Sequence, residues 1–234
     1  MMNLNMRSIF GFFLTFVTLC LASSSYALSL QDLSNKDAVG GLKEALTQGA
    51  GKAVESLGRT DGFLGNAKVK IPLPPSVQKA QGMMRTLGMG KYADELETTM
   101  NRAAEAAVPE AKTLLVNSVK KMSVEDAKGI LQGGNDAGTQ YFRRTTAESM
   151  AQKFKPIVQK AMGKVKLAEK YDQFAGKAAK FGLVKEQDTH LDEYVTQKAL
   201  DGLYLMIAEE EKAIRQDPVG AAGSMARKVF GMLK

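Results

Sequence analysis

The sequence predicts an all-α fold in a single domain of about nine helices. The run from 199 to 208, A-L-D-G-L-Y-L-M-I-A, leaves no polar stripe wide enough to face water, so a helix here should be enclosed. Elsewhere, apolar residues recur with the 3.6-residue period of an amphipathic helix. Single glycines and prolines separate these stretches, and such short connections favour helices that fold back on one another. We therefore expect the other helices to pack around the segment 199–208.

The N-terminus has the pattern of a secretory signal peptide. Arg7 supplies a positive charge, Ile9 to Ala22 form an apolar stretch, and Ser25-Tyr26-Ala27 place small residues where a signal peptidase reads them. We expect cleavage after Ala27 and export to the periplasm; a retained N-terminal anchor is the alternative. Lipidation of Cys20 is not expected, because a bulky residue precedes it inside the apolar stretch.

The expected mature chain, residues 28–234, is a helical domain without cysteine and therefore without a disulfide. Its apolar runs are too short to cross a bilayer, so no transmembrane segment is expected in it. It carries 31 Lys+Arg against 25 Asp+Glu, interleaved along the chain. Solvated helix faces explain this pattern, and an anionic partner such as a membrane surface is the alternative. We expect no nucleic-acid partner and no cofactor.

The first half of the mature chain contains one segment that cannot be helical. A capping-box pattern at Ser34–Asp37 predicts a helix that ends at Gly58. A turn-rich loop at 61–66 follows, and the prolines of Val69–Pro75 then predict an extended strap with Val69, Ile71 and Leu73 on one side. Further helices are expected over 75–87, 91–107 and 109–122, with a short one from the Ser123 cap to Gly133.

The second half should be helical throughout. Asn135-Asp136 caps a helix, Thr145-Thr146 could restart it, and Pro156 should kink it. Three more helices are expected: one over 167–181, the central helix from 188–192 to about Gln216, and a last basic helix after Asp217-Pro218.

Few residues offer catalytic or metal-binding chemistry. The mature chain has one histidine, His190, and no cysteine, so neither a structural nor a typical catalytic zinc site can be assembled. We expect His190 to be a surface or capping residue. The stretch Gly133–Gly138 lacks the spacings of phosphate-binding loops and is interpreted as a turn between helices. Its neighbours Glu125, Asp126 and Asp136 lack calcium-loop spacing, so no metal site is predicted.

Asp201 is the one acid in the apolar run 199–208. Enclosing its carboxylate would be costly without a partner, and Arg143 or Arg144 is the candidate, since Tyr141 and its neighbour should draw that segment into the core. A buried ion pair that fixes helix register is the simpler interpretation, and an active-site acid is the alternative. Asp201, Arg143, Arg144, Asp136 and Tyr141 are accordingly the candidate ligand-binding residues; no catalytic residue is assigned.

Two charged segments near the C-terminus are interpreted as structural. Glu209-Glu210-Glu211-Lys212 and Arg215 look like a solvated continuation of the central helix, with Glu211 and Arg215 as an i,i+4 pair. The last helix, with Arg227-Lys228 beside Met225, Val229, Phe230 and Leu233, should close the core of its own domain. Lying on an anionic membrane is the alternative for this helix.

Several strings resemble one bacterial family over essentially the whole mature chain. They include L-S-N-K-D-A at 33–38, K-I-P-L-P-P at 70–75, Q-Y-F-R-R at 140–144 and V-T-Q-K-A-L-D-G-L at 195–203. The family is the domain of unknown function 4197. The resemblance implies an exported, all-helical bacterial protein and offers no established activity, substrate or catalytic residue.

These observations favour a non-enzymatic binding or scaffold protein of the cell envelope. Its ligand would be an apolar or amphiphilic molecule held between helices lined by methionine and phenylalanine, since Met side chains suit irregular apolar pockets. Core packing is the simpler account of the residues concerned, which are Met83, Met84, Met100, Phe142, Phe154 and Met206. The alternative function is a periplasmic hydrolase or lyase that uses Asp201, Asp136 and Arg143 or Arg144.

Overall fold

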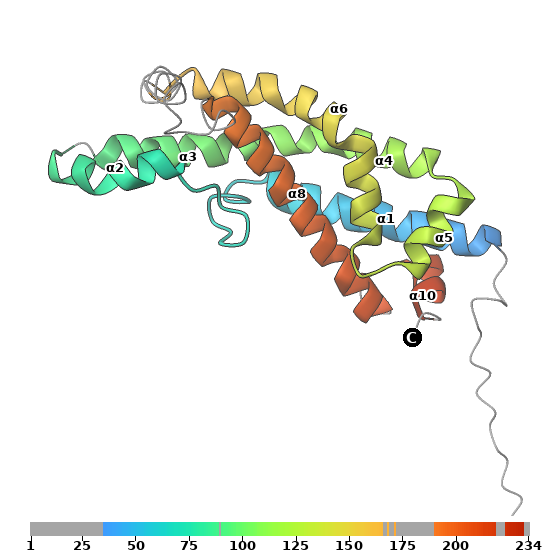
Figure 1. The fold of residues 1–234 in the computed structure, drawn as a ribbon. Helices are drawn as coiled ribbons and strands as arrows, with labels where there is room; N and C mark the ends of the chain where they lie inside the picture. The colour runs from blue at the N-terminus through green and yellow to red at the C-terminus, as the bar shows by residue number, and fades with distance from the viewer. Residues whose placement is uncertain are drawn as a thin grey trace, which may run out of the picture.

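The protein is all-helical in the part that the structure, a computed structural model, describes: residues 35–88, 90–165, 168, 171, 190–218 and 223–231. The elements are α1 (Asn35–Gly58), α2 (Pro75–Thr86), α3 (Gly90–Ala107), the 3-10 helix η1 (Val108–Glu110), α4 (Ala111–Lys121), α5 (Val124–Gln132), α6 (Ala137–Met162), α8 (Leu191–Gln216) and α10 (Ser224–Gly231) (Figure 1). The predicted fold class is confirmed. The expected signal peptide, 1–27, and the helix expected over 167–181 lie outside the described residues, 168 and 171 excepted.

α8 is the element on which the others pack, as the run 199–208 predicted. It crosses the molecule diagonally and contacts α1, α3, α6 and α10 (Figure 1). Leu200, Leu203, Tyr204 and Ile207 are each at most 3% exposed. One edge of the helix stays open, because the Leu205 side chain is 43% exposed.

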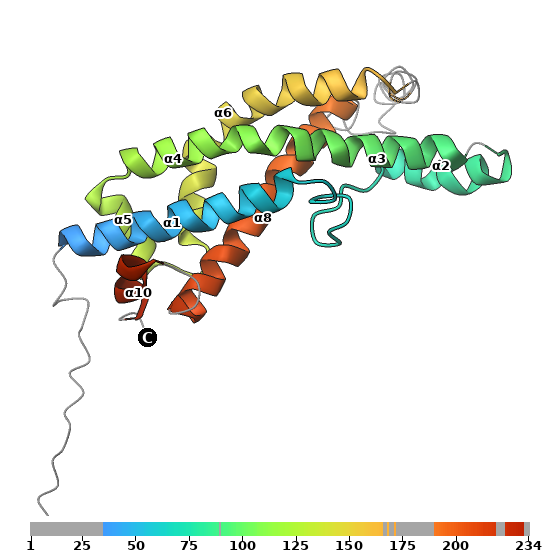
Figure 2. The same ribbon diagram turned by 180° about the vertical axis from the view of Figure 1, so that it is seen from behind.

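The C-terminal helix packs on its own domain. α10 lies along the N-terminal part of α1, and Val229 and Phe230 are buried in the shared core (Figure 2). The two helices approach closely at Gly41, where a Cβ atom would lie 2.6 Å from the Met225 carbonyl oxygen. The expectation that this helix closes the core is therefore confirmed.

The Pro-rich strap is bonded by side chains of the neighbouring helices, and one buried side chain, that of Asn101, binds both backbone groups of Ile71. Val69, Ile71 and Leu73 are buried, as their alternation predicted, and Lys70 is exposed. Asn101 on α3 binds the strap as a neighbouring strand would: its Oδ1 accepts from Ile71 N at 2.8 Å, and its Nδ2 donates to Ile71 O at 2.9 Å. A buried amide thus replaces the ladder of hydrogen bonds that an isolated extended segment lacks.

A second buried side chain fixes the loop that precedes the strap. The Glu105 carboxylate accepts hydrogen bonds from Phe63 N and Leu64 N at 3.0 and 3.1 Å, and Arg102 pairs with it at 2.7 Å. Polar anchors on α3 therefore hold both the loop and the strap against the bundle.

α6 runs unbroken through the restart expected at Thr145-Thr146, so that expectation was wrong. The Thr145 and Thr146 hydroxyls donate to the carbonyl oxygens four residues earlier, those of Tyr141 and Phe142, at 2.8 and 2.6 Å. A hydroxyl bonded in this way is not available as a cap, and such bonds often bend a helix. α6 does bend along its length (Figures 1 and 2), and Pro156 lies inside it.

Within the described residues, no helix combines the length and the hydropathy needed to cross a membrane.

Candidate functional site

The five candidate residues lie at two separate places. Asp201 and Arg143 meet beside α8, whereas Asp136, Tyr141 and Arg144 line a cleft between α5 and α6. The consecutive arginines of α6 therefore pair with different acids, Arg143 with Asp201 and Arg144 with Asp126. The combination of Asp201 with Asp136 assumed for a hydrolase or lyase is divided between the two places.

Asp201 pairs with Arg143, as predicted, but it is not enclosed. Its Oδ1 lies 3.3 Å from Arg143 Nη1 and 3.1 Å from Gln197 Nε2, and the side chains of both ion-pair partners are 43% exposed. Position 201 lies at the edge of the buried face of α8, so the carboxylate reaches water. The expectation of a sealed pair was wrong, and Asp201 remains accessible to a ligand.

Asp201 lines a groove between the start of α8 and the strap. We call it the strap groove; its volume is about 690 Å³. Its lining consists of Pro72, Pro75, Gln78, Glu193, Tyr194, Gln197, Lys198 and Asp201. Tyr194 connects the α8 wall to the strap wall, since its hydroxyl donates a hydrogen bond to Pro72 O at 3.1 Å. Because Asn101 holds the strap, this wall is preformed.

Arg143 is held beside the groove by an aromatic face. Its guanidinium carbon lies 4.6 Å from the centre of the Tyr204 ring, a cation–π arrangement. The Tyr204 hydroxyl is hydrogen bonded to Thr146 at 3.0 Å. Burial raises the pKa of Tyr204 above its ordinary value, with Thr146 and Arg143 opposing this change. Tyr204 thus stays neutral and orients Arg143.

The second place is an open cleft of about 600 Å³ between α5 and α6, lined among others by Asp126, Asp136, Gln140, Tyr141 and Arg144. Arg144 pairs with Asp126 at 3.1 Å and lies over the Tyr141 ring at 5.5 Å. Gln140 donates to Asp136 at 2.9 Å. Tyr141 is itself buried, and its hydroxyl donates to Ser118 O at 2.9 Å. The polar groups of this cleft are largely occupied by one another.

Asp126 belongs to a capping box at Ser123, where the sequence predicted a helix cap. Ser123 Oγ accepts from Asp126 N, and the Asp126 carboxylate accepts from Ser123 N and Oγ. These hydrogen bonds from the Ser123 side chain and backbone, followed by Arg144, lower the pKa of Asp126. A carboxyl group whose pKa is lowered by folding stabilises the protein above its unfolded pKa, and that contribution is lost as pH falls through the folded pKa.

Replacing Ser123 by alanine should raise the pKa of Asp126 toward its ordinary value, because the strongest hydrogen bond to the carboxylate disappears. Loss of the cap should also cost about 1 kcal/mol of stability. An NMR titration of the Asp126 carboxyl carbon and urea unfolding at neutral pH measure the two effects. Ser149→Ala, at an exposed position of α6, is the control. An unchanged Asp126 titration in S123A would contradict this account.

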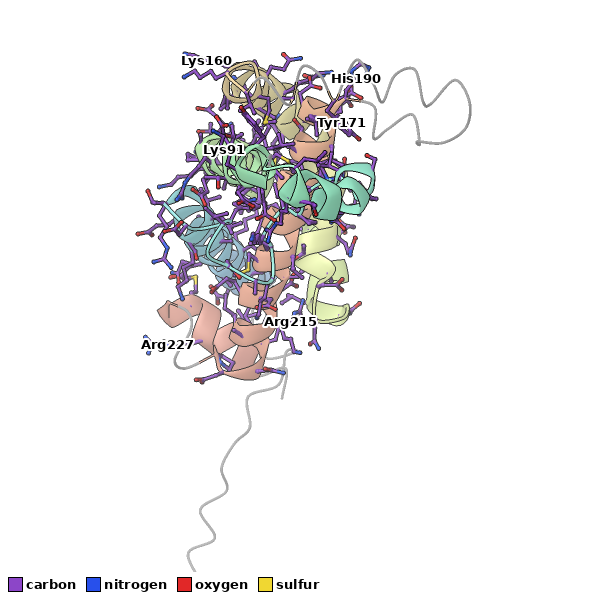
Figure 3. The ribbon with its side chains drawn as sticks, turned by 90° about the vertical axis from the view of Figure 1, so that its left-hand side faces the viewer. Lys91, Lys160, Tyr171, His190, Arg215 and Arg227 are labelled. Atoms are coloured by element: carbon purple, nitrogen blue, oxygen red, sulfur yellow. The ribbon has the colours of Figure 1, made fainter. Side chains whose placement is uncertain are left out.

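The most buried ion pair among the described residues joins Glu211 and Arg215, which the sequence analysis predicted as a pair but placed in solvent. Glu211 was interpreted as solvated, yet its side chain is 3% exposed and that of Arg215 is 10% exposed. Its carboxylate accepts from Gly138 N, Thr139 N and Thr139 Oγ1 at 2.8 to 2.9 Å, and so caps the N-terminus of α6. Arg215, labelled in Figure 3, pairs with Glu211 at 2.9 Å and donates to Ile130 O. This cluster joins α8, α6 and α5 and is structural.

The proposed methionine and phenylalanine pocket is not found as such. Met100, Phe142 and Phe154 are fully buried in the main core, and Met206 is only partly buried. The side chains of Met83 and Met84 lie outside the described residues. Where these residues are described, core packing accounts for them.

No metal centre is found in the described part of the chain, where no three His, Cys, Asp or Glu side chains group together. His190 is exposed at the N-cap of α8 and makes no side-chain capping bond (Figure 3).

The comparisons with known proteins agree with the resemblance seen in the sequence. The family model described as "Protein of unknown function (DUF4197)" matches residues 32–231. No curated protein and no solved structure matches the chain. The matched span covers every helix described above. The chain therefore belongs to the DUF4197 family of proteins of unknown function.

Proposed function

We propose that this chain is a non-enzymatic binding or scaffold protein of the bacterial cell envelope, exported to the periplasm, and that the strap groove is its ligand-binding surface. The observation that carries the proposal is the groove itself. Its volume of about 690 Å³ lies within the roughly 300–1,000 Å³ that small-molecule sites occupy.

The interior offers less space than the groove. An apolar cavity between α1, α8 and α10, lined by Ala45, Ile207 and Phe230 among others, holds about 10 Å³, enough for no more than one water molecule. An apolar molecule enclosed there is excluded by size. We accordingly place the ligand in the open groove rather than between the helices.

The groove lining favours an amphiphilic ligand. Pro72 and Pro75 provide apolar surface on the strap. Asp201 and Gln197 on the facing wall provide a carboxylate and an amide. Both can accept hydrogen bonds, so the ligand would carry an apolar part and a donor group. A cationic donor would compete with Arg143 for Asp201.

Mass spectrometry of material that co-purifies with the periplasmic protein tests this proposal. We expect a stoichiometric amphiphilic compound, and an Asp201→Ala variant should retain about tenfold less of it, as expected for loss of a hydrogen bond to a charged group. Glu209→Ala, on the same helix but outside the groove lining, is the matched control. Recovery of no compound from the wild type, or equal recovery from D201A, would contradict the proposal.

A further inference from the structure

If the strap groove is the ligand-binding surface, as proposed above, the order of side chains along its α8 wall indicates the class of ligand. Tyr194, Lys198 and Asp201 all line the groove and follow one another at intervals of four and three residues. Residues with these spacings are neighbours on one face of a helix. The wall therefore presents an aromatic ring beside the strap, then a cation, then a carboxylate.

The apolar end of this row is the place where α8 meets the strap. The Tyr194 hydroxyl donates to Pro72 O at 3.1 Å, so the ring is held close to the strap. Pro72 and Pro75, which also line the groove, are exposed. The apolar part of a ligand would therefore lie at the Tyr194 end of the row rather than beside Asp201.

Lys198 is the one basic residue in the groove lining, and it has no acidic partner among the described residues. Its Nζ lies 5.7 Å from the centre of the Tyr194 ring, and a cation–π contact at an exposed site is weak. Glu193, the second acid of the lining, is paired with Lys155 on α6 at 2.8 Å. Lys198 can therefore bind an anionic group of a ligand.

Asp201 keeps one oxygen atom available for a ligand. Its partners Arg143 and Gln197 both bind Oδ1, at 3.3 and 3.1 Å, and no described residue binds Oδ2. An ammonium group that competes with Arg143 for the charge of Asp201 therefore has an oxygen atom of its own to bind. Asp201 and Lys198 are not paired with each other, so a single ligand can contact both.

We propose that the strap groove binds the zwitterionic head of a phosphoethanolamine lipid. The phosphate would bind Lys198, the ammonium would donate to Asp201 Oδ2, and the start of an acyl chain would lie along Tyr194 and the two prolines. Lysine binds phosphate as a point charge, and a hydrogen bond from an ammonium to a carboxylate is charge-assisted. A phosphodiester is bonded on both sides, so it can lie between an apolar part and an ammonium. A carboxylate ends its chain and does not fit this order.

Calorimetric titration of the purified mature protein with short-chain probes tests the proposal. Dihexanoylphosphatidylethanolamine should bind about tenfold more tightly than dihexanoylphosphatidylcholine, which has the same phosphate and chains but no hydrogen-bond donor. Octylamine, which has a chain and an ammonium but no phosphate, should also bind about tenfold more weakly. NMR shifts at residues 71–75 and 193–201 should place the ethanolamine probe in the groove.

Two variants separate the two charges of the head. Asp201→Asn should bind the ethanolamine probe as weakly as the choline probe, with binding of the choline probe unchanged, because only the ammonium contacts Asp201. Lys198→Gln should weaken binding of both probes about tenfold, because both carry the phosphate. Glu209→Gln and Lys212→Gln remove the same charges from α8 outside the groove lining and should bind like the wild type. All four side chains reach water, so the melting temperatures should be unchanged.

The outcomes distinguish the head group from the groove itself. If the choline probe or octylamine bound the groove as tightly as the ethanolamine probe, the groove would still bind amphiphiles, but the head assigned to the ligand would be wrong. If no probe shifted the groove resonances, the head would again be wrong, and the groove would fail with it only if no compound co-purified. Equal binding of glycerophosphoethanolamine, which lacks acyl chains, would overturn the lipid in favour of a water-soluble phosphoethanolamine ester.

Discussion

Replacing Glu211 by alanine is expected to reduce the free energy of unfolding by about 3–5 kcal/mol. The carboxylate accepts hydrogen bonds from Gly138 N, Thr139 N and Thr139 Oγ1 and pairs with Arg215. Its removal leaves a guanidinium that is almost buried without its counter-ion. It also leaves the first amides of α6 without an acceptor, and unpaired buried groups of this kind are costly. Urea unfolding at neutral pH measures the loss.

Glu209→Ala is the control for this experiment. Glu209 lies on the same helix, pairs with the exposed Lys68, and its side chain is 41% exposed. Exposed pairs contribute about 0–1 kcal/mol, so this variant should unfold close to the wild type. A loss below about 1 kcal/mol in E211A would show that the cluster does not hold α6 to α8.

Replacing Gly138 should also disturb this cluster, by a smaller amount, because the added atom would push on the Leu46 side chain and on the Glu211 carboxylate. A Cβ atom there would overlap the Leu46 side chain and lie 3.2 Å from the Glu211 carboxyl carbon. The glycine thus permits the close approach of α6 to the carboxylate that caps it. The position was interpreted from the sequence only as part of a turn, because no local pattern reveals which distant side chain meets it.

The helical fold could be predicted because its signals are local. Apolar periodicity, the Ser123 cap and breaks at Gly58 and Asp217 each depend on residues close in sequence, and each agrees with the structure. The prediction that the helix restarts at Thr145-Thr146 was wrong for a related reason. A threonine hydroxyl can cap a helix or bond to the preceding turn, and the sequence does not decide between the two.

The site residues were harder to predict because their burial depends on distant elements. Asp201 was expected to be enclosed and Glu211 solvated, and the structure shows the reverse. Both lie on α8, and the placement of α6, α1 and α3 against that helix determines which of its faces is covered. The partner of Asp201 was predicted correctly, since Tyr141 and Phe142 are buried and bring Arg143 to α8.

Asn101 gave no sequence signal, although it fixes the wall of the strap groove. An asparagine in the middle of a predicted helix is ordinarily interpreted as a solvated residue. Here it is fully buried and bonded to both backbone groups of Ile71, across 30 residues of sequence. A buried amide of this kind can be recognised only when the strap and α3 are seen together.

Replacing Asn101 by alanine should reduce the free energy of unfolding by about 2–4 kcal/mol. The substitution leaves Ile71 N–H and C=O without partners, and each buried unsatisfied group costs about 1–3 kcal/mol. The loss should be largest in the strap, since no neighbouring strand replaces the amide. Urea unfolding measures the total effect, and native-state hydrogen exchange should show a loss of protection at the Ile71 amide.

Asn117→Ala, at an exposed position of α4, provides the matched control and should change neither measurement. The strap also forms one wall of the groove, so N101A should weaken retention of a groove ligand even though Asn101 does not line it. If the Ile71 amide stayed protected in N101A, the side chain would not be what holds the strap, and the preformed wall would need another cause.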